Sequence, residues 1–473
     1  MPKVAPCRGL GQHTNERREI QLEKFFRLSE RGTDVRTEFT AGIITFMTMA
    51  YILAVNPTML SATGMDAGAV FTATAIASAI ACFIMAFYAN MPFALSAGMG
   101  LNAYFTFTIV ITMGYTWQQA LGAIFVEGLL FILLTLGNIR EAIFNAIPVS
   151  QKHSLTVGIG LFLCFIGLQN AHIVVQTPTL IGAFSFQDSI MKGTFPSEGV
   201  SVLFALICIL LSSYLIVMRV RGALLIGILL IWFIGIISEV LGFYVPNPEA
   251  GFYSVIPENI VSMPASISST FMAFDLSELF SVKFLTILLA FLMVDLFDTL
   301  GTVIGVASKV NMIDEKGHFP HLKKVLMADA LGTTAAAICG TSTVTTFVES
   351  SSGIAAGGRT GLTSVVVGAL FLISLFFSPL FLAIPAFATS PILVIVGFMM
   401  VQQVQKIDWN DLLEAFPAFI GIVALVFFYS ISEGIAFGII SYTFLNFAAG
   451  RRDKLTPLMY VLSVIFLVNY FMF

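Results

Sequence analysis

The chain has 473 residues, of which 58% are hydrophobic and only 11% are charged, and its mean hydropathy is +0.94. Soluble globular proteins carry about 25% charged residues, so a soluble domain could not bury this much apolar surface and the surrounding solvent must be lipid. The net charge of −4 and the lack of a long basic tract argue against nucleic acid as a partner. The composition therefore indicates a membrane protein.

The apolar runs are about 17–25 residues long, which suits membrane-spanning helices rather than the ~10-residue alternating strands of outer-membrane barrels. Residues 1–38 form a polar, basic tail that does not resemble a signal peptide. Fourteen spans are predicted after it, at 39–60, 69–89, 92–112, 117–137, 153–170, 199–218, 222–242, 283–308, 324–340, 342–358, 361–384, 388–404, 413–430 and 431–450. A last apolar segment, within 451–473, is a fifteenth span, a hairpin or a surface-lying helix.

The distribution of basic residues supports this count. With the N-terminus in the cytoplasm and fourteen alternating spans, all of the 23 lysines and arginines except Lys192 and Lys283 fall on the cytoplasmic side. This asymmetry is what the positive-inside rule requires. The long loop at 243–282 is then extracytoplasmic. An odd number of spans in each half predicts two inverted seven-helix repeats, a common plan among secondary transporters.

The third and tenth spans are poor helix formers over half of their length. The third opens with Met91-Pro92-Phe93-Ala94-Leu95-Ser96-Ala97-Gly98, and the tenth with Cys339-Gly340-Thr341-Ser342-Thr343-Val344-Thr345-Thr346. Such backbone is tolerated at membrane depth only where it is buried in protein or lines a cavity. We therefore expect two broken helices whose N-terminal halves meet near the membrane midplane and face a ligand.

By this assignment no lysine or arginine lies in the interior of a span, since Lys283 and Lys324 are first residues, whereas several acids do. A carboxylate at the bilayer centre costs about 2.5–3.5 kcal/mol, so each acid needs a reason. Asp295 and Asp298 share one face of the eighth span, and Glu349 lies in the tenth. Without a basic partner these groups repel each other, so at least one is expected to be protonated part of the time, as a proton-coupling site requires. Glu127 and Asp329 either belong to this site or make hydrogen bonds that only stabilise the fold.

An acid-lined site favours cations or neutral molecules rich in N–H donors, because a carboxylate accepts two parallel N–H bonds. A planar heterocycle with adjacent ring and exocyclic N–H groups fits this requirement. Asn102 is a further polar candidate in the third span, and Phe93, Phe105 or Phe347 could stack on such a ring.

Several long motifs resemble one family of transporters. They are FRLSERGTDVRTEFTAGIITFMTMAYILAVNP from Phe26, SAGMGLNAYF in the third span, DLFDTLGTVIGVA in the eighth, TTFVESSSGIAAGGRTGLTS in the tenth, and EAFPAFIGIVALVFFYSISEGIAFGIISY near the end. From about residue 22 to about 450, the chain looks like the purine (adenine, guanine and hypoxanthine) permease branch of the nucleobase–ascorbate superfamily, also called nucleobase:cation symporter-2.

The resemblance implies an all-α polytopic fold with 14 transmembrane segments. A core domain (39–137 and 283–384) moves like an elevator against a gate domain (150–242 and 388–450), usually in a homodimer. The substrate-binding residues that it implies are Asp298, Glu349, Asn102, Gly100, Met99, Phe347 and Thr346. Proton coupling falls to Glu349, Asp298 and Asp295. No catalytic residue, metal or cofactor is expected, the proton being the coupling ion.

Other functions stay open at this point. Carboxylates, threonine hydroxyls and backbone carbonyls would also serve sodium, and an anion transporter can share the inverted-repeat plan, although intramembrane acids would repel its substrate. A membrane enzyme or a proton channel is a more distant alternative. The scattered cysteines and histidines show no metal-binding spacing and no catalytic constellation. The expected location is the cell membrane.

Overall fold

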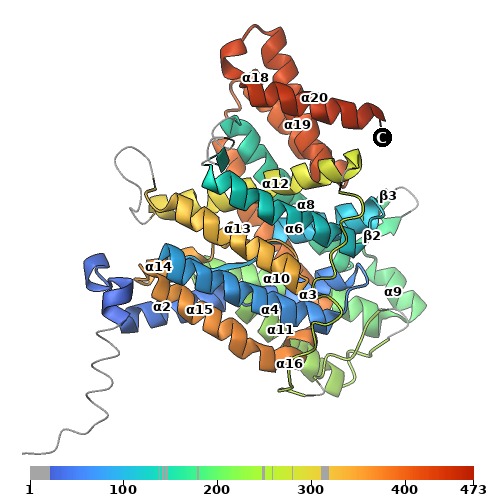
Figure 1. Ribbon diagram of the computed structural model, residues 1–473. Helices are drawn as coiled ribbons and strands as arrows, with labels where there is room; N and C mark the ends of the chain where they lie inside the picture. The colour runs from blue at the N-terminus through green and yellow to red at the C-terminus, as the bar shows by residue number, and fades with distance from the viewer. Residues whose placement is uncertain are drawn as a thin grey trace, which may run out of the picture.

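The computed structural model describes residues 22–137, 139–140, 143, 147–177, 180–247, 251–257, 259–279, 281–309 and 319–472, and these are mainly helical (Figure 1). The first 21 residues of the predicted tail, the basic residue Lys316 and the terminal Phe473 lie outside these ranges.

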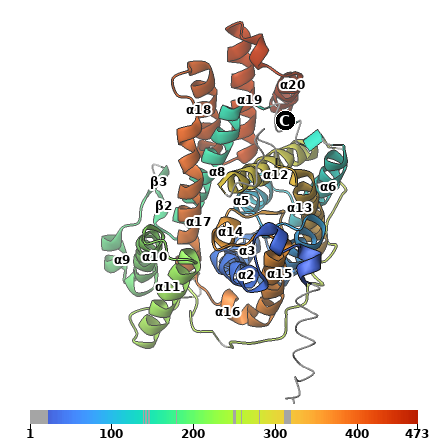
Figure 2. The same ribbon diagram turned by 90° about the vertical axis from the view of Figure 1, so that its left-hand side faces the viewer.

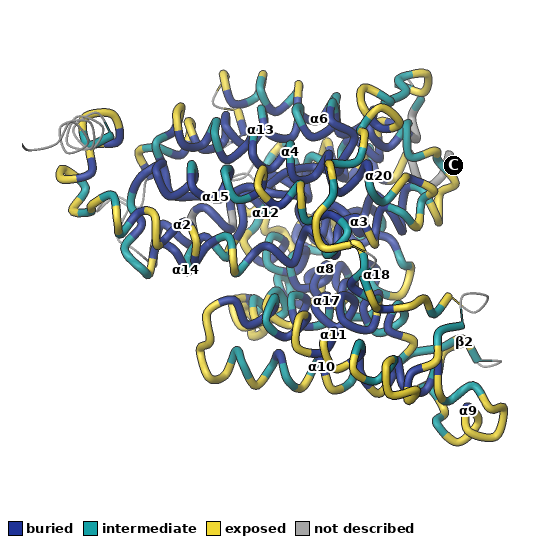
Figure 3. The backbone as a smooth tube through the Cα atoms, turned by 90° about the horizontal axis from the view of Figure 1, so that it is seen from below, coloured by how far each residue is buried: buried dark blue, intermediate teal, exposed yellow. Residues whose placement is uncertain are grey.

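The helices pack in two groups, which Figures 2 and 3 show side by side. The first group contains α2 (Val35–Met49), α3 (Ile52–Ser61), α4 (Ala67–Ile84), α5 (Met99–Ala103), α6 (Trp117–Leu136), α12 (Val282–Lys309), α13 (Leu322–Cys339), α14 (Ser350–Ala355), α15 (Gly361–Ser374) and α16 (Ser378–Leu382). The second contains α8 (Val149–Asn170), α10 (Val200–Val217), α11 (Ala223–Val240), α17 (Ala386–Val401), α18 (Leu412–Phe427) and α19 (Ile431–Ala448). Buried backbone concentrates inside the first group and along α8 and α17, which face it (Figure 3).

In the part of the chain that the structure describes, four short extended segments interrupt the helices. Strand β1 (Leu95–Ala97) pairs antiparallel with β4 (Val344–Thr346), and β2 (Val174–Thr177) pairs with β3 (Leu180–Ala183) in a hairpin. The short helix α9 (Phe186–Lys192) follows this hairpin. The pair β1–β4 joins segments almost 250 residues apart in the chain and lies inside the first group of helices, among α4, α12 and α13.

Side chains at helix ends explain where several helices begin. The Asp34 carboxylate accepts from the Thr37 N–H at 2.9 Å and starts α2, and Asp66 starts α4 in the same way. Such caps satisfy N–H groups that have no partner within the helix. The fully buried Glu38 caps a different helix from its own, because its carboxylate accepts from the backbone N–H groups of Arg359, Thr360 and Thr363 at the start of α15.

The predicted spans fall on apolar helices, but the described residues support fewer membrane-crossing helices than the fourteen predicted. Within the described ranges, nine helices are long and apolar enough to cross a membrane, and three shorter apolar helices cover Met99–Thr112, Leu412–Phe427 and Pro457–Val468. The protein is therefore a helical, multi-pass membrane protein. The number fourteen stays a prediction, as do the domain boundaries.

The last apolar segment forms a single helix, α20 (Pro457–Met472), that packs against α19. The Ser463 hydroxyl donates to the Thr443 hydroxyl at 2.8 Å across this contact. Because this segment is one helix, the predicted hairpin is wrong, and a membrane span and a surface-lying helix remain as alternatives.

Candidate functional site

The third and tenth predicted spans meet through their extended segments. In the β1–β4 pair, Leu95 lies opposite Thr346 and Ala97 opposite Val344. Two further backbone bonds extend the pairing, from Gly98 N–H to the Thr343 carbonyl at 3.1 Å and from Phe347 N–H to the Ala94 carbonyl at 3.0 Å.

A helix follows each strand. Helix α5 begins at Met99 and continues as a π-helical segment, Tyr104–Thr112, and α14 begins at Ser350. The backbone at the end of β1 passes very close to β4, because a Cβ on Gly98 would lie 2.5 Å from the Thr345 methyl carbon. Only glycine fits at position 98 without separating the strands.

Two of the predicted acids lie beside this strand pair. The Asp298 carboxylate, on α12, is 3.5 Å from the position that a Cβ on Gly98 would take. Glu349 occupies the position before the first residue of α14, and the two carboxyl groups are close enough to interact electrostatically. Both residues are half-buried. The fold thus brings together an acid from the eighth predicted span and one from the tenth.

Glu349 has a hydrogen-bond donor that the sequence interpretation missed. The Tyr51 hydroxyl donates to Glu349 Oε1 at 2.9 Å, and Tyr51 is only 1% exposed. Tyr51 lies in the first predicted span, between α2 and α3. A tyrosine in an apolar run is common, so the sequence gives no signal that distinguishes it.

The other predicted substrate residues lie in the strand pair or directly after it in the chain. Asn102 is fully buried, accepts a short hydrogen bond from the Ser342 hydroxyl, and has an amide nitrogen that makes no hydrogen bond within the described chain. Met99 and Phe347 are almost fully buried. The Thr346 hydroxyl donates to the backbone carbonyl of Thr299 at 3.5 Å.

Gly100 faces the second group of helices. A Cβ at this position would lie 2.9 Å from a methyl carbon of Ile159 on α8. Gly100 therefore lets α5 approach α8 at the boundary between the two groups.

The expectation that the intramembrane acids have no basic partner is wrong. Arg140, which the sequence placed in a cytoplasmic loop, is fully buried, and its Nη2 lies 2.7 Å from Asp329 Oδ2 and 3.7 Å from Asp295 Oδ2. Its guanidinium also donates to the Leu326 carbonyl at 3.1 Å and lies 3.8 Å above the centre of the Phe131 ring.

The position of Arg140 could not be read from helix periodicity. In one continuous helix, the 13 residues from Glu127 to Arg140 would leave the two side chains about 140° apart around the helix axis. Helix α6 instead ends at Leu136, and the chain beyond it brings the guanidinium back to α12 and α13. Asp295 is therefore engaged by Arg140 and by the Thr299 hydroxyl at 3.0 Å, so it lies in a different environment from Asp298.

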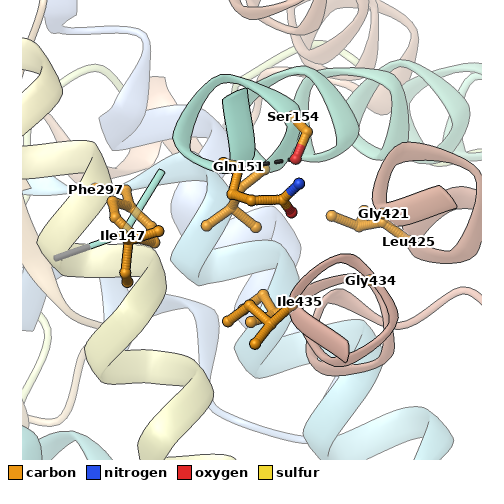
Figure 4. A pocket seen from close by; sticks show the side chains of 10 residues that line it. Ile147, Gln151, Ser154, Phe297, Gly421, Leu425, Gly434 and Ile435 are labelled. Carbon is orange, nitrogen blue, oxygen red and sulfur yellow. Dashed lines mark hydrogen bonds between the residues drawn. The ribbon is translucent and has the colours of Figure 1, made fainter. Parts of the chain in front are cut away.

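A small cavity, about 20 Å³ in volume, lies between α8, α12, α18 and α19 (Figure 4). The Gln151 and Ser154 side chains reach it among apolar neighbours, and the Ser154 hydroxyl donates to the Gln151 carbonyl. This volume suits about one water molecule. None of the predicted substrate residues lines it.

The described ranges hold no group of three or more histidine, cysteine, aspartate or glutamate side chains arranged for a metal ion. The geometry is that of a polar site buried in a helical membrane protein, and the class it defines is a transporter. In solved structures, the chain resembles the transmembrane domain of the cyanobacterial bicarbonate transporter BicA, with a TM-score of 0.61 and 14% identity over 84% of this chain and 97% of that one. This likeness shows the fold.

The sequence comparisons identify the family. Residues 36–437 match the model of the Permease family, and the chain belongs to this family. It is 38% identical to the adenine permease AdeP of Escherichia coli over 97% of this chain and 98% of that one. It is 40% identical to the guanine/hypoxanthine permease PbuO of Bacillus subtilis over 94% and 99% of the two chains. The protein is thus a permease and not an enzyme, and the resemblance found in its motifs is confirmed.

Proposed function

We propose that this protein is a proton-coupled symporter that imports purine nucleobases. One observation carries the proposal: the carboxyl groups of Asp298 and Glu349 both lie beside the β1–β4 pair and interact electrostatically, in a chain whose relatives are named as adenine and guanine/hypoxanthine permeases. Carboxylates accept N–H bonds, and each of these bases can donate one: guanine from N1–H and the adjacent 2-amino group in parallel, hypoxanthine from N1–H, and adenine from its 6-amino group. The buried amide of Asn102 supplies further polar contacts.

The same acids disfavour the anion alternative. BicA shares the fold and carries bicarbonate, so the fold leaves the substrate open. Two interacting carboxyl groups at the site would repel an anion, whereas a neutral base with N–H donors is attracted. The chemistry of the site, rather than the helix arrangement, points to nucleobases.

The acids Glu349, Asp298 and Asp295 are the candidates for the group that couples protons to transport. Carboxyl groups held close together inside the membrane do not all stay ionised, so the loaded site carries protons that it releases in the cytoplasm. Neutralising the site in this way lets it reorient without moving a net charge through lipid.

The two groups of helices support a mechanism in which the first group, as the core, moves against the second group, as the gate. The strand pair and both acids belong to the first group, and α8 of the second group packs against α5 at Gly100. The repetition of a strand followed by a helix, at the third and tenth segments, supports fourteen spans in two inverted repeats with broken helices. The N-terminus then lies in the cytoplasm of the cell, and two copies form a homodimer.

Uptake into proteoliposomes tests this function. Radiolabelled adenine, guanine, hypoxanthine, uracil and xanthine are offered under an inward proton gradient, with and without sodium. We expect saturable purine uptake that the proton gradient drives and that is lost in Glu349→Gln and Asp298→Asn. Glu433→Gln, which changes a half-buried acid of α19 outside the site, is the matched control and retains uptake. Uptake that needs sodium would favour the sodium-coupled alternative, and uptake of none of the bases would reopen the substrate class.

A further inference from the structure

A second group of ionisable side chains lies next to Asp298, Glu349 and the β1–β4 pair, which we call the base site after the proposed function. It contains Glu127 from α6, Asp295 from α12, Asp329 from α13 and Arg140, and each of the four is fully buried. We call these four residues the Arg140 cluster. Three carboxyl groups face one guanidinium, so full ionisation would leave two uncompensated negative charges away from water. Such charges are strongly disfavoured, and the cluster therefore holds protons.

The geometry distinguishes the acid that is paired from those that are not. Asp329 makes the close contact with Arg140 at 2.7 Å and is the ionised partner. Asp295 lies a full ångström farther from Arg140, and its Oδ2 makes no hydrogen bond within the described residues. Glu127 accepts from the Thr343 hydroxyl through Oε2, but its buried Oε1 likewise has no hydrogen-bond partner there. These two oxygens are the places where protons fit.

Hydroxyl groups connect the cluster to the base site. The Thr299 hydroxyl lies 3.0 Å from Asp295 Oδ1, 2.9 Å from Asp329 Oδ1 and 2.7 Å from the Thr345 hydroxyl on β4. Thr343, just before β4, donates to Glu127 with its side chain and accepts from Gly98 N–H with its carbonyl. A change of charge in the cluster thus acts directly on the strand pair that borders Asp298 and Glu349.

The proposed function requires a proton-binding site that is separate from the carboxylates that bind the base. A carboxyl group that accepts two parallel N–H bonds from a base uses both oxygens and must be ionised, so the transported proton cannot sit on that same group while the base is bound in this way. We propose that the proton that travels with the base is held by Glu127 and Asp295 in the Arg140 cluster. Arg140 and Asp329 form a fixed ion pair beside them and stay ionised throughout. This inference rests on the proposed function, since it takes the proton as the coupling ion.

The step is a simple proton transfer. A proton from the outer solution forms an O–H bond with Asp295 Oδ2 or Glu127 Oε1 when the site faces outward. The bond breaks when the site faces the cytoplasm, and the proton leaves to water. The charged groups that act on these two acids are Arg140 and Asp329 within the cluster and Asp298 on α12, and Asp298 in turn interacts with Glu349 before α14.

Glu127→Gln and Asp295→Asn test the proposal, because each keeps the size of the side chain and removes the proton site. A gradient of about one pH unit accumulates base about tenfold in the wild type if one proton accompanies each base. We expect both variants to exchange labelled base across the membrane without a gradient at rates within about threefold of wild type, yet to show no accumulation under the gradient. Glu433→Gln is the matched control and accumulates base normally. Tenfold accumulation in both variants would overturn the proposal, as would loss of exchange in variants with a normal melting temperature.

A second measurement needs no transport. The infrared spectrum of the purified wild-type protein should contain the C=O stretching band of a protonated carboxyl group, shifted in heavy water. The band should persist in Asp298→Asn and Glu349→Gln and decrease in Glu127→Gln and Asp295→Asn. A wild type without the band overturns the inference even where a variant does not fold. If the band is present but no base is taken up, the proposed function has failed and the proton site has not.

Discussion

Replacing Arg140 with methionine should destabilise the protein strongly, because it removes the one cation from a buried group of three acids. The guanidinium contacts Asp329 at 2.7 Å and Asp295 at 3.7 Å. Removing one partner of a buried ion pair costs about 3–5 kcal/mol, since the other charge is left uncompensated. At about 2.1 cal/mol/K per residue, unfolding of the chain has an entropy of about 1 kcal/mol/K. The melting temperature should therefore fall by about 3–5 °C if the whole chain unfolds together.

Thermal unfolding in detergent, followed with a thiol-reactive fluorescent dye, measures this change, because free cysteines such as Cys82 are buried until the protein unfolds. Arg451→Met is the matched control. Arg451 pairs with Asp411 at the surface, with 44% of its side chain exposed, and its loss should shift the melting temperature by less than about 1 °C. The double variant Arg140→Met with Asp329→Asn should recover part of the loss. An unchanged melting temperature in Arg140→Met, or no recovery in the double variant, would refute the reasoning.

Three further predictions follow from single contacts. Tyr51→Phe removes the hydroxyl that donates to Glu349 and should weaken base binding about tenfold in an equilibrium binding assay, because a hydrogen bond to a charged group contributes about 1.5 kcal/mol or more; unchanged affinity contradicts this. Gly98→Ala should abolish uptake by pushing β1 from β4, and adding Thr345→Ser, which removes the clashing methyl group, should restore it; no rescue rejects the clash as the cause. Glu38→Ala should lower the melting temperature by at least about 2 °C, because it leaves the N–H groups at the start of α15 without acceptors; an unchanged value means that water replaces the carboxylate.

Lipid imposes simple rules, which make the membrane class predictable from the sequence and single out Asp298 and Glu349 as candidate site residues. Apolar runs of helical length define the spans, and a carboxylate inside a span needs a partner or a function. Asp298 and Glu349 stood out for this reason, and the fold places both beside one strand pair.

The pairing of β1 with β4 could not be predicted. The runs Leu95–Ala97 and Val344–Thr346 are three residues long and almost 250 residues apart, and so short a strand carries no alternating pattern. The sequence indicated only that both stretches form poor helices.

The burial of Arg140 among acids could not be predicted from the sequence either, for a different reason. An arginine just beyond an apolar run normally lies at the membrane surface, and the charge asymmetry of the whole chain supported that interpretation. Its burial depends on where α6 ends and on the contact between its guanidinium and Asp329. Such tertiary contacts leave no local pattern in the sequence.

The most direct test of the central claim is equilibrium binding of radiolabelled adenine, guanine and hypoxanthine to the detergent-purified protein. We predict saturable binding of at least one purine to the wild type and to Glu433→Gln, and its loss in Asp298→Asn and in Glu349→Gln. Purine binding that survives in both site variants would contradict the account, because the base would then be recognised somewhere other than beside the β1–β4 pair.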